Sequence, residues 1–173
     1  SEAIEWARSV EDVALRERLA TYLYLRLARW DDAVASGERA VAATGAAHLI
    51  IRTSWVYSTR GKNFLRTILR LAGERNELRV VDDQHGCPSW SRLIAEGTMQ
   101  ILASALHREG DRWSLGGREG IYHLACRGVT SWCNLARHIL HFAEVDPMPI
   151  VTAIGTGEYP TAARRPAYSA LDC

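Results

Sequence analysis

Three clusters of polar and aromatic side chains in this 173-residue chain could perform chemistry. The first is Asp82-Asp83-Gln84-His85, which places two acids, an amide and an imidazole directly after the pair Val80-Val81. The second is Thr53-Ser54-Trp55-Val56-Tyr57, where hydroxyl groups stand beside aromatic rings. The third is Arg164-Arg165, two guanidinium groups just before Pro166. Acids and imidazoles transfer protons or bind metals, indoles stack on sugars or bases, and arginines hold phosphates.

Each cluster also has a purely structural interpretation. Acids in a short loop make turn and capping hydrogen bonds, and no second cluster offers further metal ligands, so no metal site is predicted. Alternation along a strand would place Thr53, Trp55 and Tyr57 on one side and Ser54 and Val56 on the other. The indole then either stacks on a ligand or packs in the core. The arginine pair either clamps a phosphate or forms an exposed basic turn.

The remaining reactive side chains do not predict a catalytic residue. Cys87 stands beside glycine and proline with no evident base. His123 falls within an apolar strand and is expected to be packed or hydrogen-bonded, whereas His138 and His141 are expected on the solvated edge of a helix. The chain contains no glycine-rich dinucleotide or phosphate loop after a strand, and no nucleophile elbow.

The elements that would position these clusters are alternating strands and helices. Short apolar runs predict strands at 48–52, buried and parallel, and at 77–81 and 121–125. Residues 107–120 and 144–173 are expected to be loops. Periodicity predicts helices over 63–75, from Ser91 to about 106, and from Thr130 or Ser131 to 142. The side chains expected to face the core in these helices are Leu65, Ile68, Leu69, Ala72, Ala95, Met99, Leu102, Leu106, Leu135, Ile139 and Phe142.

This alternation indicates an α/β fold, in which ligands bind at the loops that follow the strands. Residues 1–45 are expected to form a helical segment, with helices over 11–30 and 31–44, and residues 46–173 a ligand-binding part. The first two clusters and the loop residues that continue them, 82–90 and 53–63, each follow the carboxyl end of a predicted strand. We therefore expect them to lie where such a sheet binds its ligand.

The length and composition fit one soluble domain, or one domain with an appendage. With 21 basic and 20 acidic side chains the net charge is +1, so no overall field favours nucleic acid or an anionic membrane. The four cysteines show no metal-binding spacing and are expected to be free thiols in a reducing compartment. No signal peptide or membrane-spanning run is found, which predicts a cytoplasmic protein.

Several ordered segments of the chain resemble one enzyme family. Arg52 to Tyr57 reads RTSWVY, residues 61–64 read GKNF, and residues 82–89 read DDQHGCPS. The segments GIYHLACRGVTSWCNLARHI and YPTAARRPAYSALDC follow at similar spacing. Over about residues 36–173 these segments resemble the substrate-binding part of dTDP-4-dehydrorhamnose reductase, an extended short-chain dehydrogenase/reductase.

The resemblance implies a partial Rossmann-like reductase fold, and the helical pattern of residues 1–45 predicts an α-helical hairpin before it. It also implies an activity, the NADPH-dependent reduction of a dTDP-4-keto-6-deoxy sugar to dTDP-L-rhamnose. The residues that it places around the sugar nucleotide are Trp55, Tyr57, Asn63, Gln84, Pro88, Ser89 and Arg165. No nucleic-acid or membrane partner is implied, whereas a second copy of the chain or a separate nucleotide-binding half remain open as partners.

Two departures from the family pattern bear on activity. The proton-donating tyrosine and the lysine of the family's Tyr-x-x-x-Lys pair fall on Trp30 and Val34, and neither side chain can replace them. We therefore expect a truncated chain that cannot reduce its substrate unaided. One alternative is a non-catalytic sugar-nucleotide-binding or protein-interaction module, with residues 1–35 divergent from the family. Another is a degenerate fragment of the family.

Overall fold

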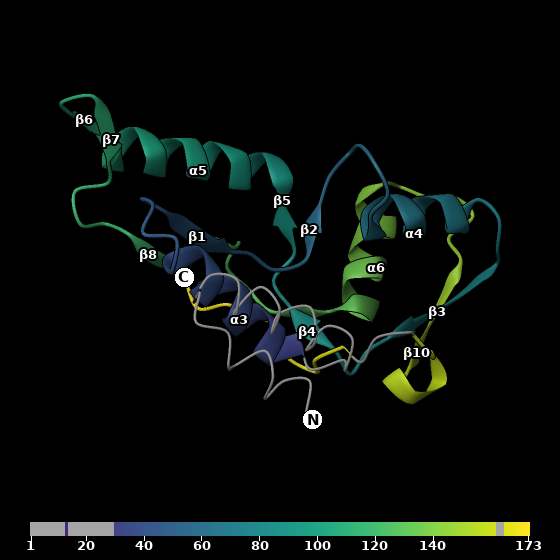
Figure 1. Cartoon of the computed structure of the whole chain (residues 1–173). Helices are drawn as coiled ribbons and strands as arrows, with labels where there is room; N and C mark the ends of the chain where they lie inside the picture. Colours follow the sequence, from purple (N-terminus) through teal and green to yellow (C-terminus); the bar gives the residue numbers. More distant parts are fainter. Residues whose placement is uncertain (1–12, 14–29, 162–164) are drawn as a thin grey trace, which may run out of the picture. The chain divides into compact units, whose positions relative to one another are not determined.

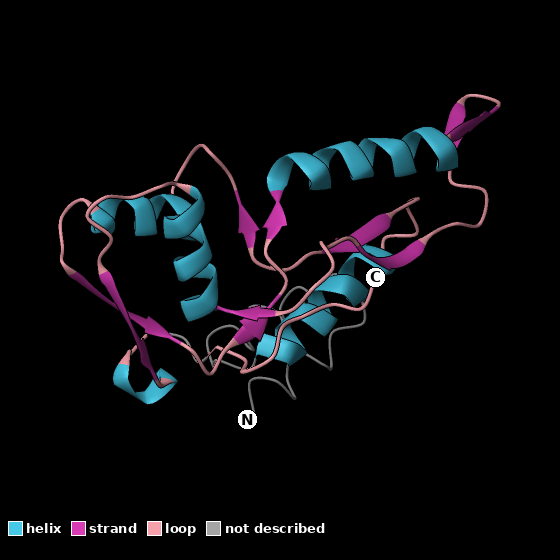
Figure 2. Ribbon diagram, turned by 180° about the vertical axis from the view of Figure 1, so that it is seen from behind, coloured by secondary structure: helices cyan, strands magenta, loops and turns pink. Residues whose placement is uncertain are grey.

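The structure, a computed structural model, describes residue 13 and residues 30–161 and 165–173 (Figure 1). It contains mixed helices and strands, in agreement with the predicted α/β fold (Figure 2). The helices are α3 (Trp30–Ala42), α4 (Phe64–Ala72), α5 (Ser91–Ala105), α6 (Trp132–Phe142) and the 3₁₀ helix η1 (Thr156–Glu158). The strands are β1 (Leu49–Arg52), β2 (Val56–Tyr57), β3 (Glu77–Val81), β4 (His85–Gly86), β5 (Ser89–Trp90), β6 (His107–Glu109), β7 (Arg112–Ser114), β8 (Gly120–His123), β9 (Thr130–Ser131) and β10 (Ile150–Ile154).

The described residues divide into two compact units. One holds the residues up to Ile50 together with Ala105–Ile121, and the other holds Ile51–Ser104 together with Tyr122–Cys173. None of the helices in the described ranges is long and apolar enough to cross a membrane. The functional boundary expected near residue 45 remains a prediction.

The first unit contains α3 and the hairpin of β6 and β7. Helix α3 matches the helix predicted over 31–44, whereas the helix predicted over 11–30 lies outside the described residues. The hairpin corrects the prediction of a loop over 107–120, because β6 and β7 pair antiparallel there. On β6 the Nε2 atom of His107 lies 2.8 Å from Oε1 of Glu109. This contact raises the pKa of the imidazole and lowers the pKa of the carboxyl group.

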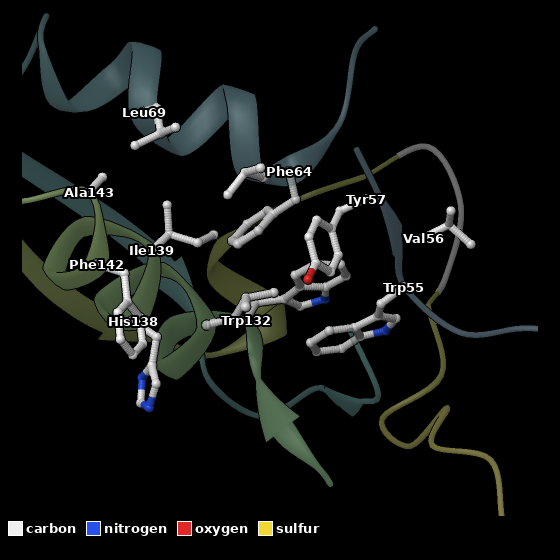
Figure 3. A pocket seen from close by; sticks show the side chains of 12 residues that line it. Trp55, Val56, Tyr57, Phe64, Leu69, Trp132, His138, Ile139, Phe142 and Ala143 are labelled. Atoms are coloured by element: carbon white, nitrogen blue, oxygen red, sulfur yellow. The ribbon is translucent and has the colours of Figure 1, made fainter. Parts of the chain in front are cut away.

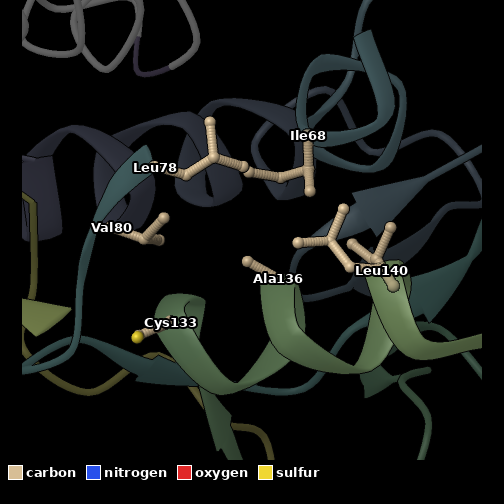
Figure 4. Close-up of a cluster of buried hydrophobic side chains, with 7 residues drawn as sticks. Ile68, Leu78, Val80, Cys133, Ala136 and Leu140 are labelled. Carbon is tan, nitrogen blue, oxygen red and sulfur yellow. The ribbon is translucent and has the colours of Figure 1, made fainter. Parts of the chain in front are cut away.

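The core of the second unit lies between the parallel pair β3–β10 and the helices α4 and α6 (Figure 4). Glu77 pairs with Ile150, and the ladder continues in step to Val81 and Ile154. Helix α4 begins after Asn63, whose side chain accepts a hydrogen bond from the Arg66 amide and caps the helix. The buried side chains of this core are Ile68, Leu78, Val80, Cys133, Ala136, Ile139 and Leu140.

Several local predictions were wrong. Strand β10 lies in a segment expected to be loop, and β1 is half-buried rather than buried. Phe142 is 79% exposed although periodicity placed it inside. On α5 the predicted inward residues Ala95 and Met99 are exposed, whereas Ile94, Gly97 and Ile101 are half-buried and Ala105 is buried. On α4, Leu69 is likewise exposed.

Short strand pairs hold the loops that follow β1 and β3. Strand β2 pairs parallel with β5, and β4 pairs antiparallel with β9. Tyr168 adds a parallel bridge to His85 on β4. The two polar clusters and the C-terminal residues are therefore brought together within the second unit.

Candidate ligand-binding site

A polar pocket of about 340 Å³ lies in the second unit. Four segments that are far apart in the sequence build it: the loop after β1, the loop after β3, the start of α6 and the C-terminal segment. Three of the predicted site residues, Trp55, Gln84 and Arg165, meet in this pocket. Its lining residues are Thr53, Ser54, Trp55, Gln84, Trp132, Arg165, Pro166 and Ser169.

Trp55 forms the wall of the pocket and is packed on both faces. Its ring stacks on the Trp132 ring, with the centroids 3.5 Å apart and the planes 7° from parallel. This separation leaves no room between the rings, so the backbone of Gly86 must lie on the other face. There a Cβ atom built on Gly86 would lie 2.3 Å from Cε2 of Trp55. Both faces of the indole are therefore packed and its edges border the pocket, while ligand contact by Trp55 remains a prediction.

The backbone of Trp55 also departs from the predicted strand alternation. Its φ is 41°, in the left-handed region that tryptophan rarely adopts. The indole Nε1 donates a hydrogen bond to Ser169 Oγ at 2.9 Å, and the Trp55 carbonyl accepts one from the Ser89 amide at 3.2 Å. These contacts hold a conformation that carries a backbone strain of about 1–3 kcal/mol.

The acids beside Gln84 have structural roles. Asp83 accepts hydrogen bonds from the amide and the hydroxyl group of Thr156, which lower the pKa of its carboxyl group. Asp82 accepts one from Ser131 Oγ, and that hydroxyl also caps α6. No group of three or more potential metal ligands occurs in the part of the chain that the structure describes.

Gln84 and Arg165 supply the polar and charged groups of the pocket. Gln84 is 6% exposed, and its Nε2 donates to Thr156 Oγ1 at 3.0 Å. Arg165 is exposed and makes no ion pair with any described residue, so its guanidinium group is available to an anion. Arg164 lies outside the described residues.

A second, apolar pocket of about 440 Å³ adjoins the same two indoles (Figure 3). Trp55 and Trp132 border both pockets, and Tyr57, a predicted site residue, lines only this one. The other lining residues are Val56, Phe64, Leu65, Leu69, Leu135, His138, Ile139, Phe142 and Ala143.

The other predicted site residues lie outside both pockets. Asn63 caps α4, and its amide group donates to the Ser58 and Arg60 carbonyls. Ser89 is fully buried and bonds to Cys87 and Cys126. Pro88 is half-buried. These three positions shape the loops that carry the pocket without lining it.

Two lining residues, Trp132 and Ser169, were not predicted. Both lie within segments that resemble the reductase family, in the TSW and RPAYSAL stretches. This resemblance could have identified them. His123, as expected, is hydrogen-bonded: its Nδ1 lies 2.9 Å from the Asp172 carbonyl oxygen. His138 and His141 are exposed, and the four cysteines are free thiols, both as expected.

Comparison with known proteins gives one consistent family. Residues 30–173 match the RmlD substrate binding domain. A dTDP-4-dehydrorhamnose reductase of Burkholderia thailandensis is 45% identical over 141 residues, which cover 78% of this chain and 46% of that protein. The reductase of Escherichia coli K12 is 40% identical, with 79% and 45% covered. The chain thus spans just under half the length of these curated relatives.

Comparison with solved structures gives the same family. A dTDP-4-dehydrorhamnose reductase from Clostridium acetobutylicum superposes with a TM-score of 0.67 at 28% identity, covering 83% of this chain and 45% of the other. The Bacillus anthracis enzyme, determined in complex with NADP, gives a TM-score of 0.66 at 29% identity, covering 82% and 46%.

Proposed function

Because the chain belongs to the RmlD substrate binding domain family, we propose that it is the substrate-binding part of a dTDP-4-dehydrorhamnose reductase. Its ligand is a dTDP-linked 6-deoxy sugar, bound in the polar pocket. The observation that carries this proposal is the convergence of Trp55, Gln84 and Arg165 from three distant segments on one pocket.

The pocket offers a partner for each chemical part of such a ligand. Arg165, which has no acidic partner in the described part of the chain, can hold the diphosphate by two parallel hydrogen bonds. Thr53 and Gln84 supply donors and acceptors for sugar hydroxyl groups. The edges of the two indoles supply an apolar wall for the carbons of the sugar ring.

The described residues do not fit a dinucleotide cofactor. Between β2 and α4 the loop carries one glycine with a positive φ, Gly61, where a pyrophosphate cradle needs several. Residues 30 and 34 on α3 are tryptophan and valine, so neither a phenol nor an ammonium group is available there. In this proposal reduction needs a nucleotide-binding half supplied by a separate segment, in the cytoplasm.

Calorimetric titration with dTDP-L-rhamnose, and separately with NADPH, tests the proposal. Saturable binding of the sugar nucleotide without binding of NADPH is expected. Arg165→Ala should weaken sugar-nucleotide binding about tenfold, the low end for a charge-assisted hydrogen bond at an exposed site. Arg127→Ala removes another exposed arginine that lines neither pocket, and should leave affinity unchanged. Binding of neither compound by the unaltered chain would reduce the family relationship to ancestry.

A second candidate is a non-catalytic sugar-nucleotide-binding module, favoured by the tryptophan and valine at positions 30 and 34. Mixing the chain with the amino-terminal half of the Burkholderia thailandensis reductase distinguishes the two. NADPH oxidation in the mixture, with the substrate present, supports a reductase part. Binding without oxidation supports the non-catalytic module.

A further inference from the structure

The C-terminal segment, residues 165–172, docks against β4 like an added strand. The His85 amide donates to the Ala167 carbonyl at 2.8 Å, and the Ser169 amide donates to the His85 carbonyl at 2.8 Å. Further along, the Leu171 carbonyl lies 3.9 Å from Cys87 Sγ. The segment is therefore fixed by main-chain hydrogen bonds at its centre.

Ser169 uses all of its polar atoms in this docking. Its hydroxyl group accepts from Trp55 Nε1 at 2.9 Å and donates to the His85 carbonyl at 3.2 Å. Its carbonyl accepts from Ser54 Oγ at 2.8 Å. One residue thus connects the C-terminal segment to β4 and to the loop that carries the indole wall of the polar pocket.

Arg165 depends on this connection for its position. It lies four residues before Ser169 on the same segment, lines the polar pocket, and makes no ion pair with any residue in the described ranges. Pro166 next to it restricts the backbone between the two. The place of the guanidinium group is therefore set by the docking of the segment and not by a partner of its own.

We propose that Ser169 is a positioning residue of the polar pocket, which fixes Trp55 and the C-terminal segment together and so places Arg165 for an anionic ligand. The ligand part of this inference rests on the proposed function, whereas the positioning part does not. By reciprocity, a diphosphate ligand that contacts Arg165 must in turn stabilise the docked segment.

The positioning role is tested without ligand, by comparing Ser169→Ala with Ser169→Thr in the full chain. Alanine should shift the Trp55 indole N–H resonance and increase hydrogen exchange at the His85 and Ser169 amides. Threonine keeps the hydroxyl group and should preserve both. If Ser169→Ala does not fold, Trp55→Phe breaks the same hydrogen bond from the other side and should raise the same exchange rates. Unchanged resonance and exchange in the alanine variant would overturn the proposal whatever the protein binds.

The ligand part is tested by a double-mutant cycle with Arg165→Ala and titration with dTDP-L-rhamnose. Each single substitution to alanine should weaken binding about tenfold. The double substitution should weaken it no more than about twofold further, because both substitutions remove the same positioned cation. A merely structural role of Ser169 predicts additive losses, about a hundredfold in the double variant, and would refute the coupling. Absence of binding by the unaltered chain refutes the proposed function alone and leaves the ligand-free result standing.

Discussion

Replacing Gly86 with alanine should displace the Trp55 indole. Gly86 lies on β4 and has no positive φ, so alanine is compatible with its backbone. The new methyl group, however, would lie 2.3 Å from Cε2 and 2.4 Å from Nε1 of Trp55. Carbon atoms in contact sit about 3.5–4.0 Å apart, so the ring or the strand must move by more than an ångström.

The cost follows from the contacts that the moving ring gives up. Leaving its place breaks the hydrogen bond to Ser169, about 0.5–1.5 kcal/mol, and the stack on Trp132, about 0.5–1.5 kcal/mol. Alanine also restricts the unfolded chain more than glycine does, which raises the free energy of unfolding by about 0.4–1 kcal/mol. We therefore expect Gly86→Ala to lower the free energy of unfolding by about 1–2 kcal/mol, within the range of overpacking.

Urea unfolding followed by far-ultraviolet circular dichroism measures this cost without relying on tryptophan fluorescence. Gly157→Ala is the matched control, because a Cβ there meets nothing within 4 Å, and should change stability by less than about 0.5 kcal/mol. In a Trp55→Ala background Gly86→Ala should no longer destabilise the chain and should stabilise it slightly. An equal cost in both backgrounds, or no cost in the unaltered chain, would refute the reasoning.

Three further expectations concern single side chains. Asn63→Ala should destabilise the chain by about 1 kcal/mol in urea unfolding through loss of the α4 cap, while Asn63→Ser should retain most of it. The hydrogen bonds from Thr156 lower the pKa of Asp83, so their contribution to stability is present above the carboxyl group's usual pKa and is lost as the pH falls through the lowered value. A carboxyl chemical-shift titration should show that lowered pKa, and Asp83→Asn should flatten the acid limb of the stability curve below about pH 4. Burial raises the pKa of the Cys133 thiol, so a thiol reagent should label exposed Cys173 at once and Cys133 only on unfolding; rapid labelling of both would contradict the packing.

The helices and strands that the sequence predicted well each carry a clear local pattern of residues. Helix α4 has its asparagine cap and one buried stripe, and β3 is a short apolar run, so both were placed within a few residues. Helix α5 carries apolar side chains around its whole circumference, so periodicity could not select the face. The side that is less exposed includes Gly97, where a Cβ would lie 3.1 Å from Leu124. Strand β10 was missed because the prolines around it indicated a loop, while its pairing with β3 is visible only in three dimensions.

The sequence predicted which loops form the candidate site, but it did not predict which side chains contact one another there. Family resemblance selected Trp55, Gln84 and Arg165, which converge on one pocket. It also selected Asn63 and Ser89, whose polar atoms turn out to be engaged in a helix cap and a buried loop. No local pattern could reveal that Trp55 is held between Gly86 and Trp132, because these residues lie 31 and 77 positions away in the sequence.

The β3–β10 ladder also joins two strands that are made at different times during synthesis. Glu77 pairs with Ile150, 73 residues further along (150 − 77). At synthesis rates of about 5–20 residues per second, β3 waits about 4–15 s for its partner to leave the ribosome. During that interval an apolar strand has an unpaired edge, which can pair with other chains. Nascent chains of this protein are therefore expected to need a chaperone until β10 is made, and slower translation between the two strands should lower the soluble yield.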